Sequence, residues 1–336
     1  MFDTILRGAR VIDPLNRLDG VNDVAIQAGK IALVAPNIKE QGIKEYDFTG
    51  KILQSGIIDT HVHISSTYGS HYGQRTLAME GVTTCLDMAG PAKCILDETP
   101  QYGAGLNIGI LEAALPPESA QSTEPSFEEI NEFIDNALDD GALGVKLLGG
   151  HYPVTPETSA KFIRSAYEKG AYVAWHAGST EHGSNIEGMV EAVDAAAGLP
   201  LHVAHINAYC RGAIKDYMDE TKIALQKLRD NPNILCESYL SARNGTRLTC
   251  DENGQVVSKV TVSCLTRYGF SPDKEGMRQA FLAHHAFVNY ERGEYIDLLT
   301  GQEGIDFWES VNTDVFGCFN VNPSVAQAWL AQAKRE

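Results

Sequence analysis

The feature that most constrains the fold of this 336-residue chain is a series of short apolar runs that alternate with amphipathic segments. The runs are GIIDTHVH, GVTTCLDMA, LNIGILEAAL, GALGVKLLGG, AYVAWHAG, LPLHVAHIN and NILCESYL. Segments such as SFEEINEFIDNALDDG lie between them and repeat apolar residues at helical spacing. Because strands buried on both faces and separated by helices form parallel βα units, seven such units predict a (β/α)8 barrel rather than an open sheet.

The two ends of the chain do not follow this alternation. Residues 1–55 are β-rich and contain a hairpin signal at Ala28-Gly29, so we expect a small separate β subdomain there and the barrel over 56–336. A β excursion is predicted over about 245–266, and helices over 273–293 and 322–336. The best local candidate for an eighth barrel strand is SVNTDVFGCFN.

Composition excludes several classes of partner. The formal net charge of -17 disfavours nucleic acid and anionic membrane surfaces, which are also negatively charged. The N-terminal stretch lacks the basic and apolar regions of a secretion signal, and no segment approaches the roughly 18 continuous apolar residues of a membrane span. Seven cysteines without a CxxC pair fit reduced thiols, and we expect a cytoplasmic protein.

The first apolar run ends in two histidines, His61 and His63, that are two residues apart. Side chains alternate along a strand, so both imidazoles lie on one face, and Asp59 lies one step behind them. Two imidazoles on one face form half of a metal site. The alternative is a pair of partly buried histidines that are satisfied by hydrogen bonds. Asp59 is interpreted as a residue that orients an imidazole.

Further ligand-type side chains fall at the ends of later runs. Lys146 ends GALGVKL, His176 ends AYVAWH and His205 ends LPLHVAH. In a parallel barrel the carboxyl ends of the strands converge, so residues distant in sequence meet there. His202 lies three positions before His205 and on the opposite face, so only one of the two can point into the barrel, and we choose His205. The alternative for Lys146 is a lysine that extends out of a strand end to solvent.

The combined pattern resembles the amidohydrolase superfamily of metal-dependent hydrolases, which have a TIM-type barrel. The resemblance rests on GIIDTHVHIS, GALGVKLLGGHYP, AWHAG and HVAHINA, in that order, and covers roughly residues 1–250. It implies two divalent metal ions, most often zinc, held by His61, His63, His176 and His205 and bridged by Lys146 as its carbamate. It also implies that residues 1–55 are part of a small β-sandwich, which the extreme C-terminus completes.

Within the superfamily, the sequence is most similar to the D-aminoacylase, dihydroorotase and hydantoinase branch. This likeness implies hydrolysis of an amide bond in an N-acyl amino acid or a cyclic amide. The turn after the second run reads DMAGP, where the D-aminoacylases commonly carry a cysteine ligand, so a hydantoinase-like centre with a bridging lysine is the more natural interpretation. The family's aspartate at the end of strand eight has one candidate, Asp314; the alternatives are a loop or cap role and a true aspartate beyond Glu336, in a C-terminal part that the chain lacks.

The substrate is expected to be a small amide that carries a carboxylate. Tyr152, Arg243 and Arg247 lie in predicted loops over the barrel mouth, and an arginine fork suits a carboxylate. Nothing in the sequence fixes the oligomeric state, and a homo-oligomer is one option. Two alternative functions remain open: an inactive scaffold on the same fold, and a deaminase of the superfamily, which would use one metal and no bridging lysine.

Overall fold

The computed structural model describes residues 1–64, 70–116, 122–239, 243–292 and 295–320. These residues form two compact units: Met1–Ile58 with Gly81–Thr83, and Asp59–Glu80 with Thr84–Glu336. Each unit is described here by itself. The predicted helix over 322–336 lies outside the described residues.

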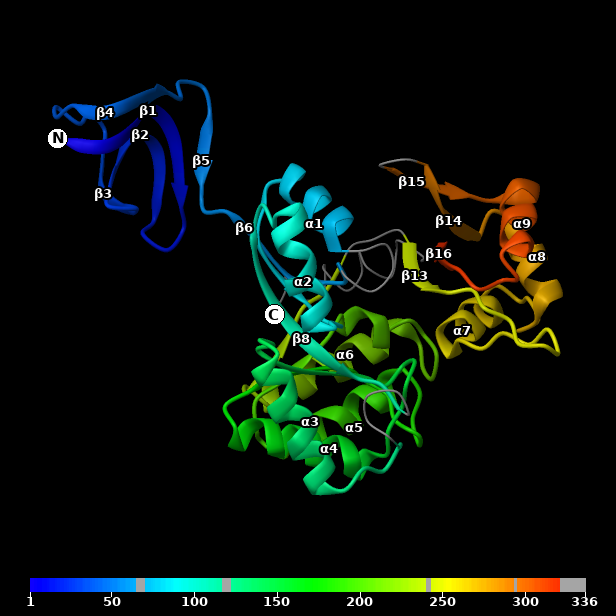
Figure 1. Cartoon of the computed structure of the whole chain (residues 1–336). Helices are drawn as coiled ribbons and strands as arrows, with labels where there is room; N and C mark the ends of the chain where they lie inside the picture. The colour runs from blue at the N-terminus through cyan, green and yellow to red at the C-terminus, as the bar shows by residue number, and fades with distance from the viewer. Residues whose placement is uncertain (65–69, 117–121, 240–242, 293–294, 321–336) are drawn as a thin grey trace. The chain divides into compact units, whose positions relative to one another are not determined.

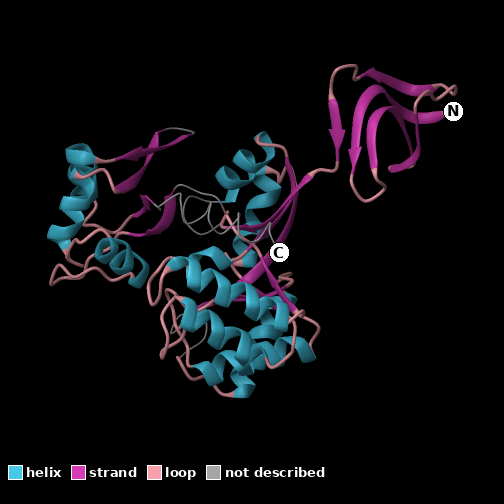
Figure 2. Ribbon diagram, turned by 180° about the vertical axis from the view of Figure 1, so that it is seen from behind, coloured by secondary structure: helices cyan, strands magenta, loops and turns pink. Residues whose placement is uncertain are grey.

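The first unit is built from strands alone. Figure 2 shows this unit as strands joined by loops. Strands β1 (Phe2–Asp13), β2 (Leu18–Gln27), β3 (Lys30–Ala35) and β4 (Gly42–Asp47) form a sheet in the order β3-β2-β1-β4, and β5 (Ile52–Gln54) pairs with β1. The predicted hairpin is confirmed, because Ala28 and Gly29 both have positive φ, as a two-residue turn with the right-handed twist requires. Residues 1–54 thus form one five-stranded sheet, and the β-sandwich remains a prediction.

The second unit contains a seven-stranded sheet that follows the chain order. Its strands are β6 (Ile57–Val62), which begins in the first unit, β7 (Val82–Asp87), β8 (Asn107–Ala114), β9 (Gly144–Leu148), β10 (Tyr172–His176), β11 (Leu201–Val203) and β12 (Ile234–Cys236). The order is β12-β11-β10-β9-β8-β7-β6, and the pairs from β7 to β12 are parallel. Each of the seven apolar runs therefore forms a strand, as predicted.

Helices follow the first six of these strands, and the predicted helical segment SFEEINEFIDNALDDG forms one of them. They are α1 (Ser70–Met79), α2 (Ala92–Tyr102), α3 (Phe127–Asp139), α4 (Pro156–Glu168), α5 (Ile186–Ala196) and α6 (Tyr217–Asp230) (Figure 1). Ser126 and Glu129 form a capping box at the start of α3, and Thr155 caps α4. Helices α3 to α6 contact one another in sequence and bury apolar faces such as Ile130 and Ile134 of α3. The chain thus has a mixed α/β fold with a curled parallel sheet.

After β12 the described chain does not add an eighth parallel strand. Strands β13 (Arg243–Arg247), β14 (Ala286–Arg292), β15 (Tyr295–Leu299) and β16 (Phe316–Asn320) instead form a four-stranded sheet in the order β13-β16-β14-β15, with antiparallel pairs. We call residues 243–320 the antiparallel region. The candidate eighth strand SVNTDVFGCFN contributes β16 to this sheet, so its assignment to the barrel is not supported.

Three helices complete the antiparallel region: α7 (Lys259–Arg267), α8 (Lys274–Leu282) and α9 (Gly301–Ser310). They bury a shared core that contains Leu248, Met277, Phe281, Trp308 and Phe319. The buried indole of Trp308 donates a hydrogen bond to the carbonyl of Leu248 at 3.0 Å. This region therefore has an apolar core of its own.

Two local predictions in this region need correction. The β excursion over 245–266 holds for β13, but Lys259–Arg267 is helical because Ser258 caps the backbone and Thr261, Cys264 and Leu265 are buried at helical spacing. The alternation of β-branched residues there favoured a strand locally, and packing overrides it. The helix predicted over 273–293 ends at Leu282, and β14 follows from Ala286.

Candidate metal centre

His61 lies on β6, and His63 directly follows the strand. Their Nε2 atoms are 3.2 Å apart, and the ring centroids are separated by 5.1 Å. Asp59 accepts a hydrogen bond from the backbone N–H of His61 at 3.1 Å, so it fixes the strand end rather than an imidazole ring. Two facing ring nitrogens can share a cation through their lone pairs.

His176 and His205 extend the cluster from the ends of β10 and β11. Their ring centroids are 4.4 Å apart, and the ring of His205 lies 5.2 Å from that of His61. The Nε2 of His176 is 2.8 Å from Ser184 Oγ, whereas the buried Nδ1 of His205 has no hydrogen-bond partner among the described residues. Burial holds the pKa of both imidazoles well below the ordinary value, so both are neutral at pH 7.

The backbone of His205 is itself unusual. Its φ of 37° and ψ of 60° lie in the left-handed region, and it is the N-cap of the short 3-10 helix η1 (Ile206–Tyr209), two residues after the end of β11. A residue with a β-carbon adopts this conformation at a cost, which often marks a functional position. The turn brings the imidazole of His205 next to those of His61 and His176.

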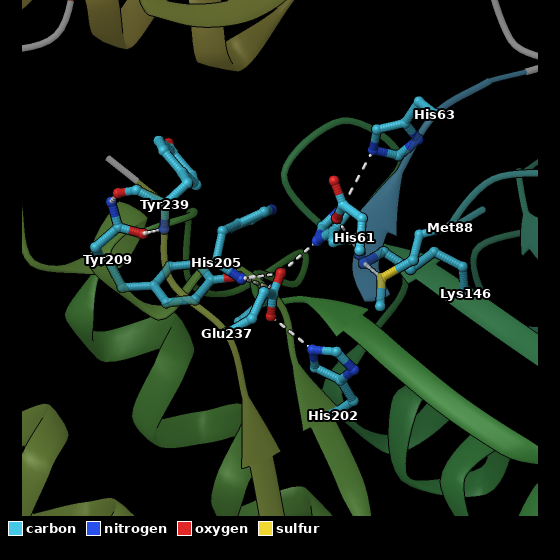
Figure 3. Close-up of polar contacts among 12 residues, drawn as sticks. His61, His63, Met88, Lys146, His202, His205, Tyr209, Glu237 and Tyr239 are labelled. Carbon is cyan, nitrogen blue, oxygen red and sulfur yellow. Dashed lines mark hydrogen bonds and ion pairs between the residues drawn. The ribbon is translucent and has the colours of Figure 1, made fainter. Parts of the chain in front are cut away.

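Lys146 is fully buried in β9, between Ala113 of β8 and Ala174 of β10. Its Nζ lies 3.1 Å from Met88 Sδ, and it forms no ion pair within the described part of the chain. Burial lowers the pKa of the amine to about 7, although the negative charge of Glu237 opposes this shift. Figure 3 shows Lys146 and Met88 close to His61. A buried amine with only a thioether partner is an uncommon arrangement, because a desolvated amine usually finds a carboxylate.

Glu237, directly after β12, is a site residue that the sequence analysis missed. Oε1 of its carboxylate bonds Nδ1 of His61 and accepts the backbone N–H of His205 at 2.7 Å. Oε2 lies 2.6 Å from Nε2 of His202, whose Nδ1 is 2.9 Å from the hydroxyl of Tyr172 (Figure 3). The sequence pattern that could have identified Glu237 is the one used for His176, namely a polar residue at the end of a short apolar run.

The ionisation of Glu237 follows from these contacts. Burial raises the pKa of its carboxyl, but hydrogen bonds from His202 and His61 oppose this effect and bring the pKa well below its usual range. Glu237 is therefore a carboxylate that only accepts hydrogen bonds. His202 is in register with Ala174, which is in register with Lys146, so His202 and Lys146 share one face of the sheet. Because both His202 and His205 contact Glu237, the prediction that only one of them can point into the barrel is not supported.

Two tyrosines and an arginine border the cluster on the side of His205. The ring centroids of Tyr209 and Tyr239 lie 5.7 and 6.2 Å from that of His205. The Tyr209 hydroxyl accepts the backbone N–H of Ala177 at 2.8 Å, and Arg211 donates to the Tyr239 hydroxyl. Hydrogen bonds thus hold the two tyrosine side chains beside the imidazole of His205.

The other predicted residues lie in two different places. Tyr152 is in the loop after β9, where its backbone N–H bonds Leu148, and the ring of neighbouring His151 lies 5.4 Å from His176. Arg243, Arg247 and Asp314 belong to the antiparallel region: Arg243 stacks on Phe287, and Arg247 lies 3.6 Å from Asp314. Asp314 is exposed and accepts a hydrogen bond from Thr249, so it does not occupy the end of a parallel strand.

The matches to known proteins begin with a model of the amidohydrolase family, which fits residues 52–229. This span is more than half of the chain. The chain belongs to the amidohydrolase family. It is 29% identical over 170 residues to a dihydroorotase of Listeria monocytogenes, and 36% identical over 98 residues to a dihydroorotase of Streptococcus pneumoniae. The matches cover 46% and 28% of this chain, and only 39% and 23% of the two relatives.

Solved structures of amidohydrolases share the fold over nearly the whole chain. A D-aminoacylase aligns with a TM-score of 0.65 at 17% identity, covering 98% of this chain and 74% of that protein. An N-acyl-D-glutamate deacylase of Bordetella bronchiseptica, solved with zinc and a phosphonate inhibitor, aligns with a TM-score of 0.66 at 13% identity and the same coverage. Among the described residues, no helix has the length and apolar character needed to cross a bilayer.

Proposed function

We propose that this protein is a metal-dependent hydrolase that cleaves a carbon–nitrogen amide bond, other than a peptide bond, in a small molecule. The observation that carries the proposal is the group of four imidazoles beside a buried lysine at the carboxyl ends of the parallel strands. The relatives support the same chemistry, because they are named as dihydroorotases and as enzymes that act on N-acyl amino acids.

The donor set fits divalent metal ions. His61 and His63 present facing ring nitrogens, and His205 has a buried ring nitrogen without a partner. We propose that these residues hold two divalent ions together with His176 and Lys146, and that zinc is the natural choice for several imidazoles. A binuclear centre is named for a solved D-aminoacylase. Such ions, when bound, would polarise an amide carbonyl and activate water.

Lys146 suits a role as a bridging ligand only after a chemical change, because an ammonium group has no lone pair. We propose that its neutral amine adds carbon dioxide: a nitrogen–carbon bond forms, one proton leaves to solvent and a carbamate with two ligand oxygens results. Two properties support this proposal. Burial brings the pKa of the amine to about 7, so much of it is neutral at physiological pH, and its nearest polar contact is a weak thioether acceptor.

The proposal also covers the barrel, the substrate class and the residues predicted to contact the substrate. We propose that the seven βα units are most of a (β/α)8 barrel, and that the substrate is an N-acyl amino acid or a cyclic amide with a carboxylate. Tyr152 stays a candidate substrate contact, because its loop lies beside His176. Arg243, Arg247 and Asp314 contact residues of their own sheet and are not used in this proposal.

The test uses the full chain, stripped of metal and then supplied with zinc and bicarbonate. We expect the protein to bind zinc and the mass of the segment that contains Lys146 to increase by one carbon dioxide. We also expect hydrolysis of at least one substrate in a panel of N-acyl-D-amino acids, dihydroorotate and hydantoins. A matched control is Lys169→Met, because Lys169 is a surface residue that pairs with Asp135.

Three results would overturn parts of the proposal. Absence of zinc binding together with absence of hydrolysis would favour a scaffold on this fold. One bound ion, an unmodified Lys146 and release of ammonia from an aminated ring would favour a deaminase. Full activity of Lys146→Met would remove the bridging role from Lys146.

A further inference from the structure

The Glu237 carboxylate joins residues from separate parts of the parallel sheet. It bonds the side chain of His61 on β6, the backbone of His205 after β11 and the side chain of His202 on β11. In the strand order, β6 and β12 are the two outermost strands. One side chain at the end of β12 therefore fixes groups at the other end of the sheet, and 176 positions separate Glu237 from His61.

These contacts determine which nitrogen of His61 carries the proton. A neutral imidazole has one N–H and one lone pair, and a carboxylate only accepts hydrogen bonds. The contact with Glu237 therefore requires the proton on Nδ1 of His61. The lone pair is then on Nε2, the atom that lies 3.2 Å from Nε2 of His63 (Figure 3). This is the orientation that a metal ligand needs.

A second arm holds the carboxylate in place. The Nε2 of His202 donates to Oε2 of Glu237, so its Nδ1 is an acceptor and the Tyr172 hydroxyl donates to it. His202 is only 4% exposed, so its ring depends mainly on these two protein contacts for hydrogen bonding. The hydrogen bonds run in one consistent direction, from Tyr172 to His202 to Glu237, and a rotated carboxylate would leave a buried N–H without an acceptor.

We propose that Glu237, supported by His202 and Tyr172, is a positioning residue that fixes the tautomer and orientation of His61 and the strained turn at His205. This inference rests on the proposed function in one respect, which is that His61 is taken to bind a metal ion. Glu237 itself contacts no substrate in this assignment; it acts through the imidazoles that it holds.

Glu237→Gln is the decisive variant because it keeps the size of the side chain. A glutamine offers one acceptor oxygen and an NH2 donor, so it cannot accept from both His61 and His202. The matched control is Glu191→Gln. Glu191 accepts a hydrogen bond from Nδ1 of His182 at 2.6 Å, which reproduces the histidine–carboxylate contact outside the centre. Tyr172→Phe removes only the far end of the chain of hydrogen bonds.

The first measurement is zinc affinity, by competition with a chromogenic chelator, together with the absorption spectrum of the cobalt-substituted protein. Glu237→Gln should weaken zinc binding by about 10- to 100-fold and change the cobalt spectrum, as expected for loss of a carboxylate that orients a ligand. Tyr172→Phe should weaken it by a smaller factor, and Lys169→Met should match the wild type. Glu191→Gln is not used for zinc affinity, because Glu191 lies with Glu181 and His182 in a group that could bind zinc by itself. A folded Glu237→Gln protein with wild-type zinc affinity and cobalt spectrum would overturn the proposal.

The second measurement separates this inference from the proposed function. Nitrogen-15 NMR of the metal-free protein reports the tautomer of each histidine side chain. We expect His61 to be fixed with its proton on Nδ1 in the wild type and in Glu191→Gln, and to lose this preference in Glu237→Gln. If the wild type binds no zinc, the proposed function fails while this result still decides the positioning role. A wild-type His61 with its proton on Nε2 would refute that role.

Discussion

The carboxyl edge of the parallel sheet and the antiparallel region contain the same kinds of residue but use them differently. In the antiparallel region charged groups have partners close by: Arg278 pairs with Glu309, and Arg247 lies 3.6 Å from Asp314. At the parallel edge, Lys146 contacts only a thioether, and Nδ1 of His205 has no partner among the described residues. The antiparallel region also contains a buried nitrogen without a partner among the described residues, Nδ1 of His285, but that ring stacks on Tyr268 and not on other imidazoles. What distinguishes the parallel edge is therefore that four imidazoles gather there beside a buried amine.

The difference also bears on the predicted substrate residues, which the structure places in two different settings. Arg243 and Arg247 were selected because an arginine fork suits a carboxylate, but each guanidinium stacks on a phenylalanine of its own sheet. These contacts are typical of a structural surface. The polar residues that surround the imidazole cluster are instead Glu237, Tyr239 and Arg211.

The largest expected effect tests whether the two regions are energetically separate. Trp308→Ala should cost about 3–5 kcal/mol in the unfolding free energy of the antiparallel region, because it opens a cavity in a fully buried core and removes the bond to Leu248. Urea unfolding measures this loss. Zinc affinity should remain within about twofold of the wild type; a parallel loss of zinc binding would show that the two regions are coupled.

The next effect concerns the parallel edge alone. Lys146→Met keeps a long side chain in the buried position, so we expect the fold to be preserved. Metal-dependent hydrolysis should fall by about 100-fold or more, because loss of a ligand should cost at least as much as loss of a residue that only orients a ligand. Steady-state kinetics and circular dichroism measure the two quantities. Lys169→Met should retain wild-type kinetics. Retained hydrolysis in the Lys146 variant would place its amine among structural groups.

A smaller effect is expected at a charged residue of the antiparallel region that contributes to stability and has no proposed role in the metal centre. Asp273 caps α8, and the backbone hydrogen bond from Gly276 lowers the pKa of its carboxyl from 3.8. Because the folded pKa is the lower one, this contribution to stability is full above about pH 4 and is lost as the pH falls through the folded value. Asp273→Ala should therefore be less stable at pH 7, and the gap should close in acid. Thermal unfolding from pH 7 to pH 2.5 tests this; a gap independent of pH would contradict it.

The smallest effect is expected at the exposed pair Arg247 and Asp314. Arg247→Gln combined with Asp314→Asn should change the unfolding free energy by less than about 1 kcal/mol, as is usual for an exposed ion pair. Zinc affinity and hydrolysis should be unchanged. A loss of hydrolysis in Asp314→Asn alone would restore Asp314 as a catalytic candidate and would break the contrast between the two regions.

The sequence was a good guide where local pattern and packing agree. Seven apolar runs predicted seven strands, and period-two spacing correctly placed His61 and His63 side by side. Helix starts are local in the same way, because the caps Ser126 and Thr155 act within one turn of the chain. These features depend on neighbours in the chain, which a single sequence displays directly.

Pattern failed where the deciding contact is distant. Residues 259–267 alternate like a strand, yet burial against the core of Leu248 and Trp308 makes them helical. The importance of Glu237 depends on a partner on β6, which the sequence around Glu237 does not reveal. The choice between His202 and His205 was made on strand position, and the structure gives each histidine a different set of contacts.

The bond between Glu237 and His61 has a consequence for assembly. Its two ends are 176 positions apart in the chain and lie on or beside the two outermost strands of the sheet, with the other strands of the sheet between them. Long-range closures of this kind form late in folding, since the chain entropy they cost is recovered only when the contacts between them exist. Under the proposed function, zinc uptake would therefore report that β12 has met β6, because an incomplete sheet lacks the arrangement of imidazoles proposed to hold the metal.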